Sequence, residues 1–432
     1  MEKGNVKALL PILVFVLFYL GLGILFEYIL KIPMGFYNVP IVVAFMLSIL
    51  VASLQSKRAF DDQLQLMGDS LSDKNIITML LIFMAAGIFV GVVGRSSAAS
   101  VAYFVLNYIP VQYAVLALFL ISCFVSLAMG TSCGTITLIA PIAVSIAEAS
   151  GFSVALCLAT VMGGAMFGDN LSFISDTTIA ACNGQGCDMK DKFKENFRIA
   201  VPATLMTLVL IQLLSNAENI TEIMHHDYNL LETVPYVLVL ACGLAGMNVF
   251  LVLVLGIVVG SLIMLLTGSV EFVKLLSNMG NGAASMFETS MMAILVPALC
   301  ALVKDSGGIT ALLNGVKFWF KGRKGGKLGI GVMVFGIDIA TANNTVAIVV
   351  ANPIVKEMAK EYDINPKQAA SLLDTYSCII QGIIPYGAQM LILLSVASGM
   401  GHTLNVFQVM QYLFYPYMLF VCLLGYIFIG EK

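Results

Sequence analysis

Charged residues are scarce in this sequence of 432 residues. Asp, Glu, Lys and Arg make up 11% of it, hydrophobic residues make up 59%, and the mean hydropathy is +0.96. Soluble domains carry about 25% charged residues, so this composition excludes a soluble domain. Long stretches hold no charge at all, among them those from Lys31 to Lys57, Arg95 to Glu148, Glu232 to Glu271 and Asp374 to Glu431. A membrane-spanning helix needs about 20 residues, so we expect an all-α polytopic membrane protein with about 11 to 13 membrane segments, some of them broken or re-entrant.

Other features that the sequence lacks narrow the function. No basic domain is present, so nucleic acid is not an expected partner. Neither a nucleophile paired with a base nor a cofactor-binding loop is evident, which argues against an enzyme and predicts no cofactor. The first apolar run, Ala8 to Phe26, is long enough to be a span and does not read as a cleavable signal. Most of the nine cysteines lie in apolar segments and read as small buried hydrophobes. Cys182 and Cys187 leave a disulfide or metal pair as a less favoured alternative, because no second pair accompanies them.

The positions of the charges predict a topology. Lys3 and Lys7 precede the first span, which favours a cytoplasmic N-terminus. Spans are expected at about 8–29, 38–54 and 75–94, a helical hairpin at 233–266 and a further helix at 283–303. Loops 55–74, 183–198 and 304–327 are basic and are expected in the cytoplasm, whereas 95–110 and the acidic segment 215–232 are expected outside. His225 and His226 in that segment read as an exposed pair, with a pH-sensing role as the less favoured alternative.

A polar cluster interrupts the apolar segment that begins at Val154. Within ten residues it presents Asp169, Asn170, Ser172, Ser175, Asp176 and Thr177, after glycines that let the backbone open. Either acid alone could cap a helix. The whole cluster at membrane depth is costly, however, and such residues persist where they face a cavity, a partner or an ion. Because all its ligands are oxygens, the cluster predicts a site for a hard cation such as Na⁺.

The second half of the chain repeats this pattern after 212 residues. Pro141 then coincides with Pro353, Thr131-Ser132 with Asn343-Asn344, and Asp169 with Gln381. The first copy ends at a basic loop and the second begins at one, so the two copies should cross the membrane in opposite senses. Two inverted repeats whose broken helices meet at the midplane are typical of secondary transporters.

Four polar breaks, at 130–135, 168–178, 341–345 and 381–389, should therefore converge. The first copy is acidic and should hold the cation or proton, and the second copy is rich in amides and should hold another cation or an organic substrate. The predicted metal-site residues are Asp169, Asn170, Ser172, Ser175, Asp176, Thr177, Thr131 and Ser132. The predicted substrate-site residues are Thr135, Asn343, Asn344, Thr345, Gln381 and Gln389.

Three further acids are weaker candidates. Asp338 and Asp374 lie near or inside helices of the second copy, and Glu288 begins a helix. Acids inside a membrane are functional by default, but acids at helix ends are often simple caps. For Asp338 and Glu288 both a pathway role and a structural role stay open.

These patterns divide the chain into five parts. We expect N-terminal membrane helices at 1–110, the first transport repeat at 111–198, and connecting helices with a basic loop at 199–327. The second repeat should occupy 328–400 and a C-terminal membrane helix 401–432. Whether 111–150 and 329–362 are re-entrant hairpins or broken through-helices is open at this point.

The motifs also resemble a known family. Gly130-Thr131-Ser132 with Gly134-Thr135, the run from Phe167 to Thr178, and Ile384 to Gln389 resemble the NhaC family of Na⁺/H⁺ antiporters in the ion transporter superfamily. The likeness covers about residues 120–400. It implies a sodium-coupled carrier in the bacterial inner membrane, with Asp169, Ser172, Asp176 and Thr177 carried over as site candidates. Many members of the family have proline where Phe173 stands and tryptophan where Tyr386 stands.

Two functions follow from these observations. In the first, the protein exchanges Na⁺ for H⁺, and both compete for one buried carboxylate. In the second, it is a Na⁺- or H⁺-coupled carrier of an amino acid or small organic acid, because carriers of both kinds are found among the family's relatives. The expected partners are sodium ions, protons and the lipid bilayer, and a homodimer is left open.

Overall fold

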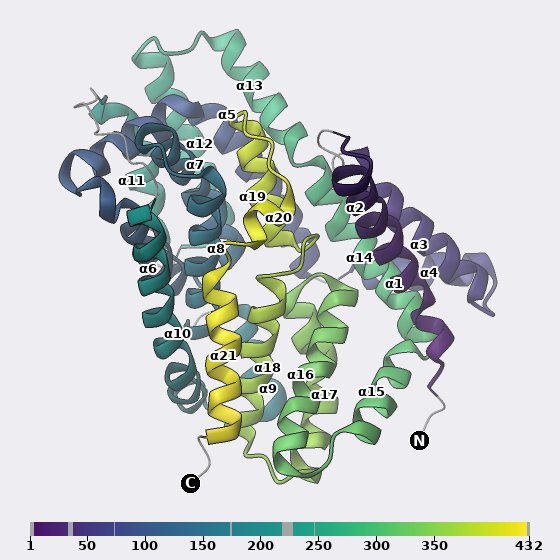
Figure 1. Cartoon of the computed structure of the whole chain (residues 1–432). Helices are drawn as coiled ribbons and strands as arrows, with labels where there is room; N and C mark the ends of the chain where they lie inside the picture. Colours follow the sequence, from purple (N-terminus) through teal and green to yellow (C-terminus); the bar gives the residue numbers. More distant parts are fainter. Residues whose placement is uncertain are drawn as a thin grey trace.

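The computed structural model describes residues 4–32, 38–72, 74–172, 175–217, 228–245 and 247–429. Nearly all of these residues lie in helices, and none of them forms a strand (Figure 1). The predicted all-α class is confirmed. His225 and His226 lie outside the described residues.

Within this part of the chain, seven helices are long and apolar enough to cross a membrane. The helices Ser97–Tyr108 and Val111–Leu127 meet at a bend of 112°. They add an eighth membrane span if the pair crosses the membrane as one unit. Four shorter apolar helices accompany them: Ile41–Gln55, Leu230–Val239, Ala388–Gly399 and Phe414–Ile429. The sequence predicted a larger number of membrane segments because that number also counts short and bent helices of this kind.

The N-terminal helices pack beside a central helix, α14 (Phe287–Asp305). Helical turns run without a break from Val6 to Ile29 and include α1 (Leu10–Val16) and α2 (Leu22–Ile24). They are followed by α3 (Ile41–Gln55) and α4 (Phe60–Ser70). The prediction that 55–74 is only a loop is therefore wrong, since α4 occupies most of it. An ion pair between Arg58 and Asp305, at 2.7 Å, ties the start of α4 to the end of α14.

Helix α5 runs from Lys74 to Tyr108, so the external loop predicted at 95–110 is also wrong. It packs against α7 (Ser132–Ser150), α12 (Val249–Leu266) and α13 (Phe272–Ser285). A glycine pair allows the closest of these contacts, because a Cβ atom on Gly87 would lie 2.1 Å from the backbone oxygen of Gly282. The chain turns at Pro110, before the short turn Val111–Tyr113.

Two sets of four helices form the repeats. The first set is α6 (Ala114–Met129), α7 (Ser132–Ser150), α8 (Val154–Leu171) and α9 (Asp176–Gln185). The second set is α16 (Gly322–Thr341), α17 (Asn344–Glu361), α18 (Pro366–Gln381) and α19 (Ala388–Gly399). The starts of α7, α8 and α9 coincide with those of α17, α18 and α19 after a shift of 212 residues, and the ends of α6 and α16 do the same.

The breaks themselves have the same local structure in both repeats. Helix α6 ends at Gly130 with a φ of 66°, and α16 ends at Ala342 with a φ of 46°. The next residue then caps the following helix, since Thr131 accepts a hydrogen bond from the Gly134 amide and Asn343 accepts one from the Val346 amide. Left-handed backbone followed by a cap stops one helix and starts another in a new direction.

The repeats are inverted. In Figure 1, α7 and α19 lie in the upper half of the molecule, and α9, α16, α17 and α18 lie in the lower half. Helices α16 and α17 pack side by side as a hairpin, while α18 and α19 run on from the lower to the upper half. Helices α8 and α9 together form one broken span, Val154–Gln185. All four breaks are thereby brought toward the middle of the molecule.

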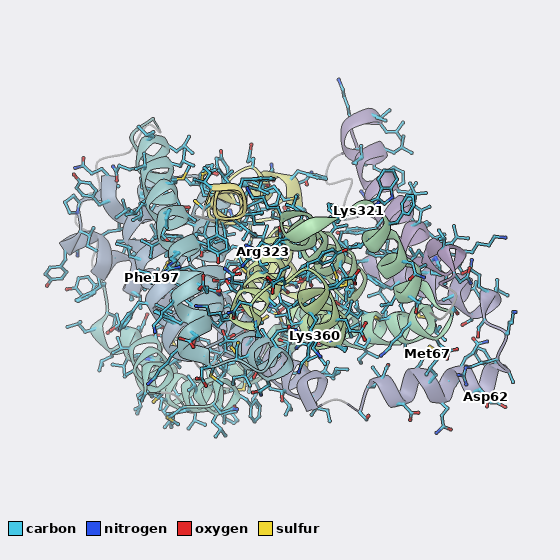
Figure 2. The ribbon with its side chains drawn as sticks, turned by 90° about the horizontal axis from the view of Figure 1, so that it is seen from below. Asp62, Met67, Phe197, Lys321, Arg323 and Lys360 are labelled. Carbon is cyan, nitrogen blue, oxygen red and sulfur yellow. The ribbon has the colours of Figure 1, made fainter. Side chains whose placement is uncertain are left out.

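The remaining helices surround the repeats. They are α10 (Met189–Ala217), α11 (Leu230–Leu244), α15 (Gly308–Trp319), α20 (Val406–Met410) and α21 (Phe414–Ile429). The predicted hairpin at 233–266 is confirmed as α11 and α12. The segments 183–198 and 304–327 are not simple loops, because α10 begins within the first and α15 occupies the second. Lys192 and Lys327 from these segments are buried, whereas Lys321, Arg323 and Lys360 lie on the face seen from below (Figure 2).

Candidate functional site

Asp169 lies where the four breaks meet. It sits in the last turn of α8 and is only 4% exposed. One carboxylate oxygen accepts hydrogen bonds from Ser132 Oγ at 2.8 Å and from Asn344 Nδ2 at 3.0 Å. The other oxygen accepts one from Ser175 Oγ. The donors come from α7, α17 and the cap of α9, so this carboxylate joins both repeats.

Two glutamines complete the ring of contacts from the second repeat. Gln389 donates to Ser132 Oγ at 3.0 Å and accepts a hydrogen bond of 2.6 Å from Gln381. Gln381 also donates to the backbone oxygen of Ala342 at 3.0 Å. The position that carries an acid in the first repeat, Asp169, therefore carries an amide, Gln381, in the second, and both side chains point to the same place.

These side chains line a small cavity of about 90 Å³. The predicted residues in its wall are Thr131, Ser132, Asp169, Asp176, Asn343, Asn344, Thr345, Gln381 and Gln389. Ser175 and Thr177 lie directly behind Asp169, because their hydroxyls are 2.8 Å apart and Thr177 Oγ1 lies 3.5 Å from the backbone oxygen of Asp169. Most of the residues predicted from the four breaks are thus brought together.

Three predicted residues point elsewhere. Asn170 bonds to Thr375 on α18, Ser172 donates to the Leu127 backbone oxygen at 2.9 Å, and Thr135 donates to the Thr131 backbone oxygen at 2.9 Å. Asp176 lines the cavity but is exposed, so the two acids of the cluster have different surroundings. Of these two acids, Asp169 has the buried, hydrogen-bonded environment expected of an ion-binding carboxylate.

A second polar cluster lies behind the first. Lys192 on α10 forms a buried ion pair with Asp374 on α18, and its ammonium group also donates to the Asn170 backbone oxygen and to Thr178 Oγ1, each at 2.7 Å. Asn196 donates to Asn170 Oδ1 at 2.9 Å and to Asp374 at 3.2 Å. This cluster ties the helix that carries Asp169 to the second repeat.

Sequence reasoning missed Lys192 and Asn196. It assigned this stretch to a cytoplasmic loop because Lys190, Lys192, Lys194 and Arg198 are close together. The available signal was the spacing of Lys192 and Asn196, which lie four apart and so share one helix face. Thr78 on α5, which also lines the cavity, gave no signal in the sequence.

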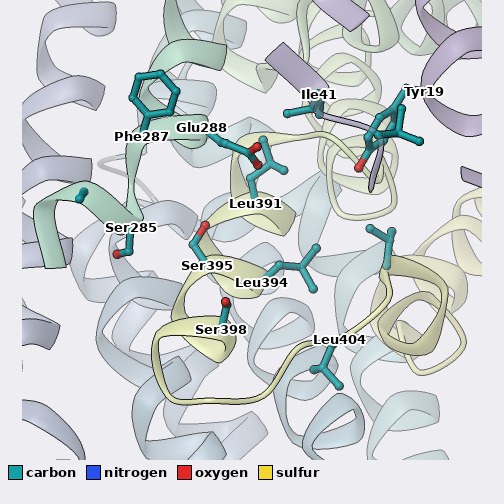
Figure 3. A pocket seen from close by; sticks show the side chains of 13 residues that line it. Tyr19, Ile41, Ser285, Phe287, Glu288, Leu391, Leu394, Ser395, Ser398 and Leu404 are labelled. Atoms are coloured by element: carbon teal, nitrogen blue, oxygen red, sulfur yellow. The ribbon is translucent and has the colours of Figure 1, made fainter. Parts of the chain in front are cut away.

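The other acids weighed from the sequence have distinct positions. Asp374 belongs to the Lys192 cluster, and Asp338 is fully buried on α16. Glu288, in the first turn of α14, points toward Leu391 across a cavity of about 340 Å³ (Figure 3). Ser395 and Ser398 of α19 line that cavity too, about two and two and a half turns beyond Gln389 on the same helix.

Cys182 and Cys187 are both free thiols in this structure. Gly186 between them has a φ of 73°, and the amides of Gly186 and Cys187 both bond to the Cys182 backbone oxygen. The two cysteines thus close the end of α9 as an ordinary left-handed helix cap.

Inverted repeats, broken helices and a buried polar centre define a secondary transporter. The chain belongs to the Na⁺/H⁺ antiporter family, whose model matches residues 6–215 and 229–430. The family predicted from the motifs is confirmed, and it is a family of transporters rather than enzymes.

The chain is also similar to individual proteins. The chain is 23% identical over 352 residues to the Na⁺/H⁺ antiporter NhaC of Bacillus subtilis, covering 73% of this chain and 77% of that protein. It is 22% identical over 379 residues to an uncharacterised Na⁺/H⁺ antiporter of Haemophilus influenzae, covering 76% and 80%. A shorter match, 28% identical over 137 residues, relates 32% of this chain to 29% of the malate-2H⁺/Na⁺-lactate antiporter of Bacillus subtilis. Among solved structures, the YdaH transporter of Alcanivorax borkumensis matches with a TM-score of 0.44 and 12% identity, covering 96% of this chain and 97% of that one.

Proposed function

We propose that the protein exchanges Na⁺ for H⁺ across the membrane and that the two ions compete for the carboxylate of Asp169. The observation that carries this proposal is the buried position of Asp169 at the meeting point of both repeats, held by Ser132, Ser175 and Asn344. Family membership supports the same activity.

The groups around Asp169 suit both states of such a carboxylate. Hydroxyls and amides can donate or accept, so Ser132 and Ser175 can offer a lone pair to Na⁺ and Asn344 can offer its carbonyl oxygen after its amide turns over. With these ligands and the carboxylate, the site is made of oxygens alone, as a hard cation prefers. When Asp169 takes a proton, it loses the charge that attracts Na⁺. Because Asp169 then holds either a proton or Na⁺ but not both, binding of one ion releases the other, and the two ions are exchanged.

The helix ends support the same site. Helices α6, α8, α16 and α18 end at the breaks with their negative C-terminal dipoles, and α7, α9, α17 and α19 begin there with their positive ends. The negative helix ends stabilise a bound cation, and the positive helix ends stabilise the carboxylate beside it. The two sets are equal in number, so the backbone adds no net charge to the site. Alternating access would then move one repeat against the other around the site.

A second candidate function is weaker. A Na⁺- or H⁺-coupled carrier of an amino acid or organic acid would need room, and pockets for organic ligands occupy about 300 to 1,000 Å³. The cavity beside Asp169 measures about 90 Å³, and no lysine or arginine is among the described residues of its wall. Thermal-shift screening with amino acids and organic acids in the presence of Na⁺ tests this alternative, which fails if no organic ligand stabilises the protein.

We further propose a bacterial inner-membrane location with the lower face of Figure 1 in the cytoplasm. Lys321, Arg323 and Lys360 lie on that face, which supports this orientation by the positive-inside rule (Figure 2). The described chain begins in the lower half, so the N-terminus would also be cytoplasmic. A homodimer stays a prediction, as do the five domain boundaries.

The test of the proposed activity uses purified protein in liposomes loaded with a pH-sensitive dye. Addition of Na⁺ should release the quenched dye signal as protons leave the lumen, and Asp169→Asn should abolish the response. Absence of any Na⁺-dependent pH change with the wild type, over a range of pH, would exclude Na⁺/H⁺ exchange.

A further inference from the structure

A second buried acid, Asp338, is linked to Asp169 through Ser377 and Asn344. Asp338, near the end of α16, is 0% exposed. Ser377 Oγ donates to its Oδ2 at 2.9 Å, whereas its Oδ1 has no hydrogen-bond partner among the described residues. Asp169, by contrast, accepts three side-chain hydrogen bonds. The two acids therefore differ in how well their surroundings stabilise a negative charge.

This difference predicts that Asp338 loses a proton less readily than Asp169 does. Burying a carboxylate without a cation partner costs several kcal/mol, and each missing hydrogen bond adds to that cost. No salt bridge to Asp338 is formed by the described lysine, arginine or histidine residues. With one hydrogen bond and one bare oxygen, Asp338 fits the neutral, protonated form in the conformation seen here.

The ionisable groups on the elements around Asp338 do not change this conclusion. They include Lys367, Asp374, Tyr376 and Cys378 on α18, Tyr386 before α19, and Glu288, Lys304 and Asp305 at the two ends of α14. Lys356, Glu357, Lys360 and Glu361 lie in the last turns of α17, and Tyr415, Tyr417, Cys422 and Tyr426 lie on α21. Asp374 is already paired with Lys192, and Asp305 with Arg58. Tyr386 donates its hydroxyl to the Ile339 backbone oxygen at 2.8 Å.

A short chain of groups links Asp338 to the proposed sodium site. Ser377 Oγ lies 2.9 Å from Asp338 and 3.4 Å from the backbone oxygen of Asn344, but its single proton can serve only one of them. The side chain of the same Asn344 bonds to Asp169. Any shift of Asn344 when Na⁺ binds at Asp169 would therefore change what Ser377 can offer to Asp338.

The repeat shows that packing does not require an acid here. After the shift of 212 residues, Asp338 corresponds to Ser126, and Ser377 corresponds to Ala165. In the first repeat Ser126 Oγ donates to the Ala165 backbone oxygen at 2.6 Å and joins α6 to α8. A serine thus holds the equivalent helices together, and the carboxyl group at 338 is an addition that the second repeat alone carries.

We propose that Asp338 is a second proton-binding site of the exchange cycle, so that two protons move for each Na⁺. Protonated Asp169 and Asp338 each release a proton as Na⁺ binds to Asp169, and each regains one when Na⁺ leaves. A cation at Asp169 favours the charged form of an acid linked to it, and the contacts through Asn344 and Ser377 provide that link to Asp338. One net positive charge then crosses the membrane per cycle. This inference rests on the proposed Na⁺/H⁺ exchange.

The stoichiometry can be measured directly. Proteoliposomes are given a pH difference of about one unit and a membrane potential held at zero with potassium and valinomycin, and the Na⁺ ratio at which net Na⁺ flux stops is determined. Each exchanged proton contributes the free energy of about a tenfold ratio, so one proton balances about a tenfold Na⁺ gradient and two protons balance about a hundredfold gradient. The wild type should reverse near the hundredfold ratio.

The variants are Asp338→Asn, which keeps the shape, and Asp338→Ser, which copies the first repeat. Both should reverse near a tenfold ratio, and Glu148→Gln, an exposed acid paired with His402, should keep the wild-type ratio as a matched control. Reversal of the wild type near tenfold, reversal of the variants near hundredfold, or complete loss of exchange in both folded variants would overturn the proposal. No pH-driven Na⁺ flux in the wild type would instead mean that the proposed function itself fails.

Discussion

Asn344, the first residue of α17, donates a hydrogen bond of 3.0 Å to the carboxylate of Asp169 at the end of α8. The two residues belong to opposite repeats and meet at the centre of the molecule. Through this bond the side chain proposed to hold the cation is sensitive to the position of the second repeat. Binding of an ion and movement of a repeat are thereby linked by one contact.

Mutations of Asp169 and Asp176, the two acids of the first polar cluster, should have very different effects on exchange. Asp169→Asn should lower the rate of Na⁺/H⁺ exchange at least about a hundredfold, because loss of a charged ligand in a buried site costs about 3 kcal/mol or more. Asp176→Asn should change the KM for Na⁺ only a few fold, since Asp176 is exposed at the edge of the cavity. Initial rates of dye response in liposomes measure both, and equal effects of the two variants would contradict this assignment.

Removing a neutral ligand should weaken Na⁺ binding and leave the protein folded. Ser132→Ala or Asn344→Ala should each raise the KM for Na⁺ about tenfold, because a hydrogen-bonding partner of a charged group is worth about 1.5 to 3 kcal/mol. Ser145→Ala is a suitable control, since Ser145 is buried on the same helix as Ser132 and does not line the cavity. A KM unchanged in both ligand variants would exclude them from the ion site.

The buried pair of Lys192 and Asp374 should matter for stability. Removing one partner, as in Lys192→Met, should destabilise the protein by about 3 to 5 kcal/mol, because it leaves an uncompensated buried charge. The double variant Lys192→Met with Asp374→Leu should recover much of that loss, since neither charge remains. Thermal unfolding in detergent measures this, and a double variant less stable than either single one would show that the pair is not the source of the effect.

The matching breaks make a prediction about backbone strain. Ala342 has a φ of 46°, a region in which residues other than glycine cost about 1 to 2 kcal/mol. Ala342→Gly should therefore stabilise the protein by up to about 1 kcal/mol, after the entropy of glycine is subtracted. Gly130→Ala at the equivalent break should destabilise it by about 1 kcal/mol. Ala342→Gly should raise the unfolding temperature and Gly130→Ala should lower it. Shifts of the same sign in both variants would contradict the claim that the two breaks are equivalent.

The sequence predicted the breaks well because their causes are local. A capping Thr or Asn and a proline ten residues later are visible in the chain itself, as at Thr131 and Pro141, and Gly130 favours a left-handed turn before the first cap. Duplication of the pattern then indicated an inverted repeat. Thr78 could not be found in this way, because its place in the cavity wall depends on how α5 packs.

Long-range pairing explains the errors in the segments 183–198 and 304–327. Lys192 reads as a loop residue because lysine is usually solvated, and only the fold brings Asp374 to it. Lys327 is similar, since it is buried with its ammonium group 5.6 Å from the centre of the Tyr426 ring. The positive-inside rule counts such residues as surface charges, so the predicted loops were too long where a lysine had a buried partner.

The central claim is that Na⁺ and H⁺ compete for Asp169, and the KM for Na⁺ as a function of pH tests it most directly. Initial exchange rates would be measured at a series of equal internal and external pH values over a wide Na⁺ range. Competition predicts that the KM rises at least about tenfold for each unit of acidification once Asp169 is protonated, while the rate at saturating Na⁺ is recovered. A KM that stays constant while the saturating rate falls with acidification would contradict the account.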